Sequence, residues 1–173
     1  MEKIRLAGPG DAEALLALQH RLDAQSSSML LEPAEREQDP EPLRTLLAAQ
    51  NRTWGSFDLI AEAPDAPKQP DRLAGWLEVQ VLPYRRARHT GYLVIGVDAA
   101  AAGHGIGTAL LTEAVAEATR RGLRRLELTV MTDNLRAVAL YLRGGFQVEG
   151  LRRRALHRDG APIDEYYMGR LLE

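Results

Sequence analysis

Three strand-like segments follow one another in the middle of this chain, without a helical pattern between them. They occupy residues 57–63, 72–82 and 88–98, and the polar, proline-rich stretch at 64–71 is typical of an exposed hairpin loop. A doubly wound parallel sheet would instead need a helix in each connection between strands. This succession argues against a Rossmann-type sheet and favours a hairpin at the centre of the fold.

Helical and strand patterns surround these three segments. In chain order they are a strand at 3–7, helices at 12–25 and 42–52, and, after the central strands, a helix at 106–121, a strand at 124–131, a helix at 134–145 and a hairpin at 146–172. Asp11 is the candidate N-cap of the first helix, Gly122 ends the third, and Asp159-Gly160 forms the hairpin turn. The order is too helical for a sandwich and predicts an α+β fold with a mixed sheet, in a single domain over residues 1–173.

Charge and composition exclude several classes of function. The 173 residues include 22 Lys and Arg against 24 Asp and Glu, and this formal net charge of -2 provides no strong field for nucleic acid or anionic lipid. The absence of cysteine excludes disulfides, thiolate metal ligands and a cysteine acyl carrier. His20 and His157 lack metal-ligand spacing, so we expect no metal.

The sequence carries no recognisable targeting or membrane-spanning segment. Its start, M-E-K-I-R-L-A-G-P-G-D, has no apolar signal region, and no window approaches about 18 consecutive apolar residues. We therefore expect a cytoplasmic protein with no membrane partner. The arginine clusters at 84–88 and 151–158 lack interleaved aromatic residues, so we also expect no nucleic-acid partner.

A glycine-rich loop, V-D-A-A-A-A-G-H-G-I-G, leads from the strand at 88–98 into the next helix. A dinucleotide-binding G-x-G-x-x-G would need a further glycine at Thr108 or Leu110, and a P-loop would need a lysine, which is absent here. The unpaired N–H groups and the dipole at a helix start can bind phosphate, and glycine lets phosphate approach the backbone. The alternative is that these glycines only turn a strand-to-helix corner.

Together with a second motif, this loop resembles a known family. The loop, one following strand and then N-x-x-A-x-x-L-Y-x-x-x-G-F are similar to the motifs of the GNAT superfamily of acyl-CoA-dependent acetyltransferases, with sequence-level matches over residues 85–172. The sequence looks more particularly like a bacterial subgroup that acetylates amino acids and amines. The resemblance implies the GNAT-type mixed, largely antiparallel sheet flanked by helices. One position departs from the family pattern, because Ala102 stands where Gln or Arg is usual.

The resemblance implies acetyl-CoA as the cosubstrate and assigns positions that hold it. The backbone of Val97 would pair with the pantetheine arm and polarise the thioester carbonyl, and main-chain N–H groups of the loop would receive the pyrophosphate. Asn134 is an ordinary N-cap as well as a candidate contact. The positions expected to contact the cofactor are Val97, Ala102, Gly103, His104, Gly105, Ile106, Gly107, Thr108, Asn134 and Ala137.

Tyr141 matches the tyrosine that serves in many members of this family as a general acid toward the leaving sulfur. A phenol with a pKa of about 10 can protonate a thiolate whose conjugate acid is nearer about 8.5 only with favourable positioning. The alternative is that Tyr141 is an apolar residue of its helix face, beside Leu140.

The general base has three candidates. Glu78 is a carboxylate inside an apolar strand, where desolvation would raise its pKa, and strand alternation places it on the face of Trp76 and Gln80. If that face is exposed to solvent, Glu78 is an ordinary strand glutamate. His89 titrates in a suitable range but follows a polar loop, and Glu32 lies in the connection that contributes to the acceptor pocket in this fold. We rank Glu78 first, with Glu32 and His89 as substrate-binding candidates.

The leading hypothesis is an N-acetyltransferase that moves acetyl from acetyl-CoA to a primary amine of a small molecule. Without cysteine, direct transfer in a ternary complex is favoured over an acyl-enzyme. A protein N-terminal or lysine acetyltransferase is one alternative, which a broad, acidic groove would support. A non-catalytic CoA-binding module is the other, indicated by Ala102 and the undefined base. The family resemblance also makes a homodimer plausible.

Overall fold

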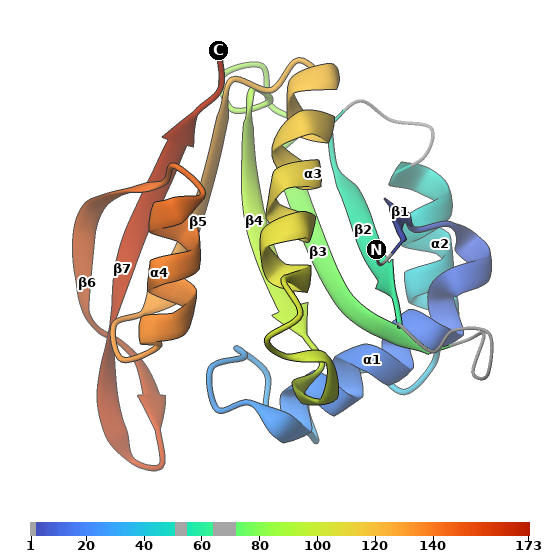
Figure 1. Cartoon of the computed structure of the whole chain (residues 1–173), viewed down its shortest axis with the longest axis horizontal. Coiled ribbons are helices and arrows are strands. Elements are labelled where there is room, and N and C mark those ends of the chain that lie inside the picture. Colours follow the sequence, from blue (N-terminus) through green and yellow to red (C-terminus); the bar gives the residue numbers. More distant parts are fainter. Residues whose placement is uncertain (1–2, 51–54, 64–71) are drawn as a thin grey trace.

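The strands predicted from the sequence form one mixed sheet in the computed structural model, which describes residues 3–50, 55–63 and 72–173. The strands lie in the order β1-β2-β3-β4-β5-β7-β6 (Figure 1). They are β1 Ile4–Leu6, β2 Phe57–Glu62, β3 Leu73–Val81, β4 Thr90–Val97, β5 Arg125–Met131, β6 Gln147–Arg158 and β7 Ala161–Leu171. The α-helices are α1 Ala12–Gln25, α2 Glu41–Gln50, α3 Ile106–Arg120 and α4 Leu135–Arg143, and short 3₁₀ turns lie at Pro9–Asp11 and Ala99–Ala101.

Neighbouring strands of this sheet are antiparallel except for β4 and β5. The α+β class and the mixed, largely antiparallel sheet are therefore confirmed. The central strands pair in the order of the sequence, as the expected hairpin requires. The loop predicted at 64–71 and the end of the second predicted helix, 51–52, lie outside the described residues.

Helices cover both faces of the sheet, and strand alternation decides which side chains meet them. Leu77 and Val79 of β3 pack in the cluster that includes Leu110 of α3. Trp76 packs on the opposite face, in the cluster that includes Leu18 of α1 and Leu47 of α2. Glu78, two residues after Trp76, lies on the face of α1 and α2 as the alternation predicted.

The parallel pair β4–β5 is short, and this shapes the functional region. Only Thr90–Tyr92 pair with Arg125–Glu127. Farther along, β4 stays bonded to β3 and β5 stays bonded to β7, and the two strands separate from each other (Figure 1). The backbone groups that face this divergence are not used by a β4–β5 ladder within the described residues, so they are available to pair with an extended ligand.

Local signals predicted several element ends correctly. Gly122 has a φ of +77° just after α3, and Asp159 and Gly160 have φ values of +53° and +77°, as a two-residue hairpin turn of type I′ requires. Asp11 is the N-cap residue of α1, as predicted, but its side chain makes no capping hydrogen bond to that helix. Its carboxylate accepts the N–H of Gly8 at 2.8 Å and pairs with Arg5 at 2.7 Å, because Asp11 belongs to the 3₁₀ turn before the helix.

β6 forms one edge of the sheet and is largely exposed. Val148 and Leu151 on this strand are 47% and 51% exposed. An exposed edge strand can pair with another chain. The homodimer stays a prediction, since a single chain does not test it. Within the described part of the sequence, no helix has the length and apolar character needed to cross a membrane.

Candidate active site

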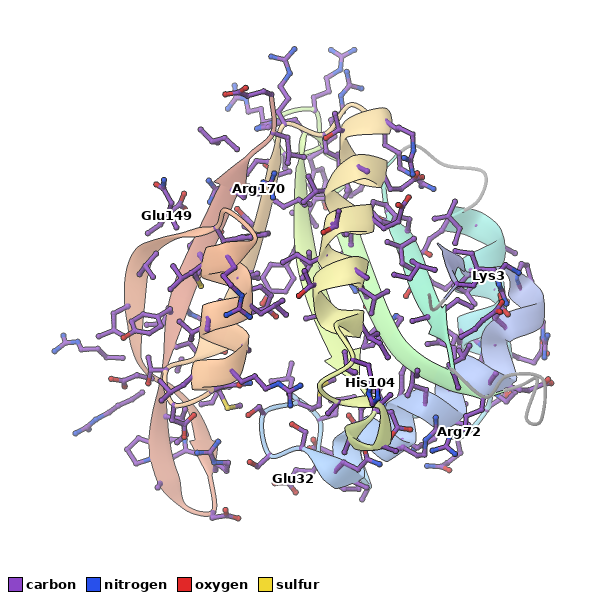
Figure 2. The ribbon with its side chains drawn as sticks, in the orientation of Figure 1. Lys3, Glu32, Arg72, His104, Glu149 and Arg170 are labelled. Carbon is purple, nitrogen blue, oxygen red and sulfur yellow. The ribbon has the colours of Figure 1, made fainter. Side chains whose placement is uncertain are left out.

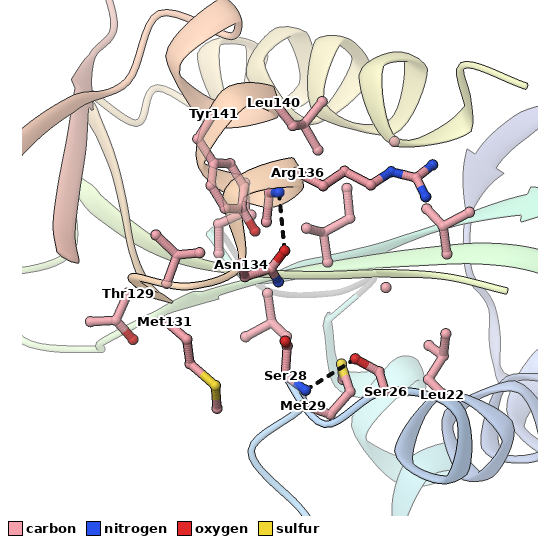
Figure 3. A pocket seen from close by; sticks show the side chains of 18 of the residues that line it. Leu22, Ser26, Ser28, Met29, Thr129, Met131, Asn134, Arg136, Leu140 and Tyr141 are labelled. Carbon is pink, nitrogen blue, oxygen red and sulfur yellow. Dashed lines mark hydrogen bonds between the residues drawn. The ribbon is translucent and has the colours of Figure 1, made fainter. Parts of the chain in front are cut away.

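A cavity of about 710 Å³ lies where β4 and β5 diverge (Figure 3). Its walls come from both strands, from the glycine loop and the first turn of α3, from α4, from β6 and β7, and from the segment after α1. The expected cofactor positions that line it are Val97, Ala102, Gly103, Gly105, Ile106, Gly107, Thr108, Asn134 and Ala137. Segments far apart in sequence therefore meet at one site, and most of the candidate residues are there.

The glycine loop presents bare backbone to this cavity. Gly103 and Gly105 have φ values of +86° and +83°, and a Cβ added at either would have no heavy atom within 4 Å. Side chains rarely adopt this backbone conformation, and the open space beside it leaves room for a ligand. Gly105 is the residue immediately before α3, whose first N–H groups have no partners within the helix. The loop and helix start thus have the form of a phosphate-binding site.

Gly107 differs from the other two glycines. It lies within α3, and an added Cβ would lie 3.3 Å from Cδ2 of Leu140 in α4. A side chain there would crowd the contact between the two helices. Gly103 and Gly105 therefore leave space beside the loop, whereas Gly107 allows α4 to pack closely against α3.

His104 is the expected cofactor position that does not line the cavity. Its Nδ1 lies 3.3 Å from the carbonyl oxygen of Ala101, and its side chain borders a separate hollow of about 330 Å³ together with Arg72 and Asp98. Figure 2 labels His104 and Arg72 in this region. A contact from His104 to the cofactor would have to come from its main chain.

Two arginines of α4 line the cavity and were not predicted from the sequence. Arg136 and Arg143 are seven residues apart, which places them on one face of a helix. Neither forms an ion pair with any residue that the structure describes. Their spacing on a helix after a predicted phosphate loop was the signal that could have found them. They add positive charge to the side of the cavity formed by α3 and α4.

Asn134 immediately precedes α4, and Tyr141 lies in its last turn. The side-chain oxygen of Asn134 accepts the N–H of Ala137 at 3.2 Å, which confirms the N-cap (Figure 3). Tyr141 is 6% exposed, packs at 5.9 Å from the ring of Phe146 and also lines the cavity. Burial and the nearby Tyr92 raise the pKa of Tyr141 above its ordinary value of 10.0. Tyr141 therefore keeps its proton at neutral pH, and because the raised pKa makes it a weaker acid, donation to the sulfur depends on close positioning.

Glu78 lies beside the cavity but is not in its lining. It pairs across the sheet with Asp58 on one side and with Val94, which lines the cavity, on the other. Burial and the charge of Asp58 raise the pKa of Glu78 to about 7, against a hydrogen bond from Gln80 at 2.6 Å that lowers it. A carboxylate with this pKa can both take and release a proton near neutral pH. To reach an acceptor in the cavity, it would need a water molecule.

Glu32 and His89 lie away from the cavity lining. Glu32 is exposed on the loop that follows α1 (Figure 2), where its N–H bonds to the carboxylate of Glu35 at 3.0 Å. His89 is exposed immediately before β4, at the end where β4 and β5 are still paired. The geometry does not support a substrate contact for either residue in this conformation.

The part of the cavity away from the glycine loop has polar groups that the sequence did not single out. The hydroxyls of Tyr92 and Thr129 lie 2.7 Å apart across the β4–β5 divergence. Arg152 Nη1 donates to Glu165 Oε2 at 2.7 Å, from β6 to β7. These pairs depend on strand register, and no motif in the sequence marks them.

The segment after α1 forms another wall and is held by a buried ion pair. Ser28 and Met29 line the cavity (Figure 3), and farther along Arg36 bonds to both carboxylate oxygens of Asp23. The Asp23 side chain is fully buried, and that of Arg36 is 13% exposed. A buried charge that loses its partner is costly, so this pair anchors the wall to α1.

We expect Arg36→Met to lower the free energy of unfolding by about 3–5 kcal/mol, because Asp23 would remain buried without its partner. Denaturant unfolding measures this change. The exposed ion pairs of Arg44 with Glu13 and Glu41 offer a control, and Arg44→Met should cost no more than about 1 kcal/mol. An equally small effect for both variants would show that the Arg36–Asp23 pair does not anchor the segment.

Comparison with known proteins identifies the class to which this fold and cavity belong. The chain belongs to the acetyltransferase (GNAT) family, whose model matches residues 23–146. A solved GNAT-family acetyltransferase from Streptococcus pneumoniae is 31% identical, with a TM-score of 0.92 and full coverage of both chains. The family resemblance and the GNAT-type fold are thereby confirmed.

Curated relatives carry different substrate names. The L-amino acid N-acetyltransferase AaaT of Escherichia coli (strain K12) is 35% identical over 57% of this chain and 62% of its own length. The N-alpha-acetyltransferase RimI of Mycobacterium tuberculosis is 47% identical over 51% of this chain and 50% of its own length. The matched region thus spans only about half to three fifths of these relatives, and their substrates differ from each other.

Proposed function

We propose that this protein is an N-acetyltransferase that transfers acetyl from acetyl-CoA to the primary amine of a small molecule. The observation that carries the proposal is that the bare glycine backbone before α3 and the buried hydroxyl-bearing Tyr141 of α4 open onto one cavity. Membership of an acetyltransferase family supports the reaction class.

The residues of the cavity fit acetyl-CoA in chemical character. The main-chain N–H groups of Gly105 to Gly107 suit a pyrophosphate, and Arg136 and Arg143 add charge for its phosphates. The backbone of β4 at Val97 faces the divergence and suits the amide groups of a pantetheine arm. These contacts use main chain at the loop, so Ala102 does not exclude them.

Acetyl-CoA supplies a thioester carbonyl carbon that accepts the amine nitrogen, with release of the CoA thiol. In the proposed mechanism, the Val97 backbone orients this carbonyl and the Tyr141 hydroxyl donates its proton to the departing sulfur. The raised pKa of Tyr141 makes its hydroxyl a weaker acid, so this step requires the hydroxyl to lie within hydrogen-bond distance of the sulfur as negative charge develops. The chain has no cysteine, which favours direct transfer to the amine over a cysteine-linked acyl-enzyme.

Glu78 is our candidate for the base that takes a proton from the acceptor ammonium through water. If so, kcat/KM should rise with pH through about 7, the pKa of Glu78, as its carboxylate becomes ionised. Glu78→Gln should remove this inflection from the pH profile and lower kcat/KM above pH 7. Glu62→Gln, a change at a partly buried ion pair on β2, is the control and should leave the profile unchanged. An unaltered profile in Glu78→Gln would exclude Glu78 as the base.

The pH dependence of protein stability is a second way to measure the pKa of Glu78. The pKa of about 7 in the folded protein exceeds the ordinary 4.5, so the folded state binds more protons than the unfolded state between these values. The contribution of Glu78 to the free energy of unfolding should therefore fall as pH rises from about 4.5 to 7, so Glu78→Gln should become less destabilising relative to the wild-type protein as pH rises. This readout does not depend on any assumption about catalysis.

A small acceptor is favoured over a protein substrate by the surroundings of the cavity. Ser28, Met29 and Leu30 cover one side, and Arg158 near the tip of the β6–β7 hairpin bonds to Asp133 and reaches the Ser27 carbonyl at 3.5 Å. These contacts bridge the segment after α1 and the hairpin across the acceptor side. The name of the RimI relative keeps a protein N-terminus as the second candidate.

Release of CoA thiol from acetyl-CoA, measured across a panel of amines, tests the proposal. The panel includes amino acids, polyamines and peptides with free N-termini or lysines. We expect turnover with at least one small amine and none with peptides. Turnover with peptides alone would favour the protein-acetylating alternative, and acetyl-CoA binding without any turnover would identify a non-catalytic CoA-binding module.

A further inference from the structure

The charged side chains that line the cavity are unevenly distributed. Among the described lining residues they are Arg136, Arg143, Arg152 and Glu165. The first two belong to α4, beside the glycine loop, and the other two belong to β6 and β7. The proposed cofactor site accounts for the α4 arginines, whereas the pair on β6 and β7 has no role in it.

The Arg152–Glu165 pair lies at the end of β5 from which α4 begins. Glu165 is paired in register with Met131 of β5 and with Arg152 of β6, and Met131 accepts the main-chain N–H of Asn134 at 3.0 Å. Met131, Asn134 and Tyr141 all line the cavity (Figure 3). The ion pair is therefore on the wall that an acceptor would contact on its way to the thioester.

The two members of the pair differ in exposure. The Glu165 side chain is 8% exposed, whereas that of Arg152 is 53% exposed. The contact to Glu165 uses Nη1 at 2.7 Å, and the same arginine lines the cavity. Glu165 thus fixes the orientation of a planar fork of donors, an arrangement that matches a carboxylate.

We propose that Arg152, positioned by Glu165, binds a carboxylate of the acceptor, so that the substrate is an α-amino acid with an uncharged side chain. This inference rests on the proposed acetyltransferase function. The carbon skeleton of the acceptor would contact Met29, Met131 and Leu156, which line the same cavity. The amine would then point toward the thioester, on the side of Tyr141.

The charge balance of the cavity disfavours a polycation as the acceptor. Its lining carries three arginines and one carboxylate, and that carboxylate is already paired. A polyamine would place several positive charges among these groups, and like charges brought together oppose binding. An amino acid instead offers one carboxylate to Arg152, and its amine must be neutral to react.

The test compares each uncharged proteinogenic amino acid with the amine that lacks only its carboxylate, such as leucine with 3-methylbutylamine. For the wild-type protein we expect kcat/KM to be at least about tenfold higher for the best amino acid than for its decarboxylated partner. In Arg152→Met the KM for that amino acid should rise at least about tenfold, while kcat/KM for the partner amine stays within about twofold. Because the wild-type protein and the variant are compared on the same acceptor, the different amine pKa values of the two acceptors do not affect this comparison.

Further variants separate binding from folding. Arg153→Met changes the adjacent exposed arginine, which does not line the cavity, and should leave both values unchanged. Arg152→Lys keeps the positive charge but loses the planar guanidinium, and it should retain part of the preference for the amino acid over the amine without a carboxylate. If Arg152→Met melts early because Glu165 is left unpaired, Arg152→Met/Glu165→Gln removes the buried charge and should show the same loss of preference.

The outcomes distinguish this inference from the function on which it rests. Equal or better turnover of amines without a carboxylate, or an Arg152→Met variant that keeps the preference, would overturn the assignment of Arg152 and leave the acetyltransferase function intact. Acetyl-CoA binding without turnover of any amine would overturn both. Saturation with acetyl-CoA at an unchanged KM in Arg152→Met is expected, because the cofactor side of the cavity is untouched.

Discussion

Gly105→Glu should raise the dissociation constant of acetyl-CoA by about 100-fold or more, equivalent to roughly 2.7 kcal/mol. Gly105 precedes α3 with a φ of +83°, and a side chain there would project into the open cavity. The new carboxylate would occupy the place proposed for the pyrophosphate and repel it. Isothermal titration with acetyl-CoA measures the change.

Gly122→Glu is a matched control for this substitution. Gly122 follows the other end of α3 with a φ of +77°, and an added Cβ there also meets open space. A side chain in this left-handed conformation costs about 1–2 kcal/mol at either position, so both variants should melt at similarly reduced temperatures. Only Gly105→Glu should lose affinity, and equal affinities for the two variants would refute the pyrophosphate assignment.

Tyr141→Phe should lower kcat by about 10²–10⁴-fold, the range that a general acid contributes. Phenylalanine keeps the ring that packs near Phe146 and removes only the hydroxyl, so the melting temperature and the affinity for acetyl-CoA should change little. Steady-state kinetics with the best acceptor, together with binding of acetyl-CoA, separate the chemical step from the cofactor contact.

Tyr84→Phe serves as the comparison, because Tyr84 is 68% exposed and away from the cavity. It should leave kcat unchanged. Full turnover in Tyr141→Phe would show that the hydroxyl does not donate the proton and that Tyr141 acts only by packing. A loss of acetyl-CoA affinity in parallel with kcat would instead indicate a cofactor-binding role.

Much of the fold could be predicted because its signals are local. The strand segments of the centre, the helix starts at Ile106 and Leu135 and the turn at Asp159-Gly160 depend on hydrophobic period, capping and glycine conformation. Asp11 shows the limit of such reasoning, because it occupies the N-cap position of α1 without the side-chain bond of an N-cap. Its position before α1 suited an N-cap, but Arg5 and the N–H of Gly8 bind its carboxylate instead.

The same distinction between local signals and long-range contacts applies to the candidate site. Motifs that are continuous in sequence led to the glycine loop, Asn134 and Tyr141, which the structure brings to one cavity. Glu32 and His89 were chosen from their place in loops, and both lie outside its lining. The expectation that Glu78 shares a face with Trp76 follows from alternation alone, whereas its raised pKa depends first on burial and then on the charge of Asp58 in a neighbouring strand.

Local patterns in the chain were enough to predict the order of elements, the bare-backbone loop before α3 and the tyrosine of α4, because each depends on residues close together in the sequence. Long-range contacts are needed to know that β4 and β5 separate after three residue pairs and that Arg152 and Glu165 meet across β6 and β7. The register of strands and the position of a cavity depend on contacts between distant segments. The acceptor side is built from such contacts, which is why its chemistry becomes visible only in the folded chain.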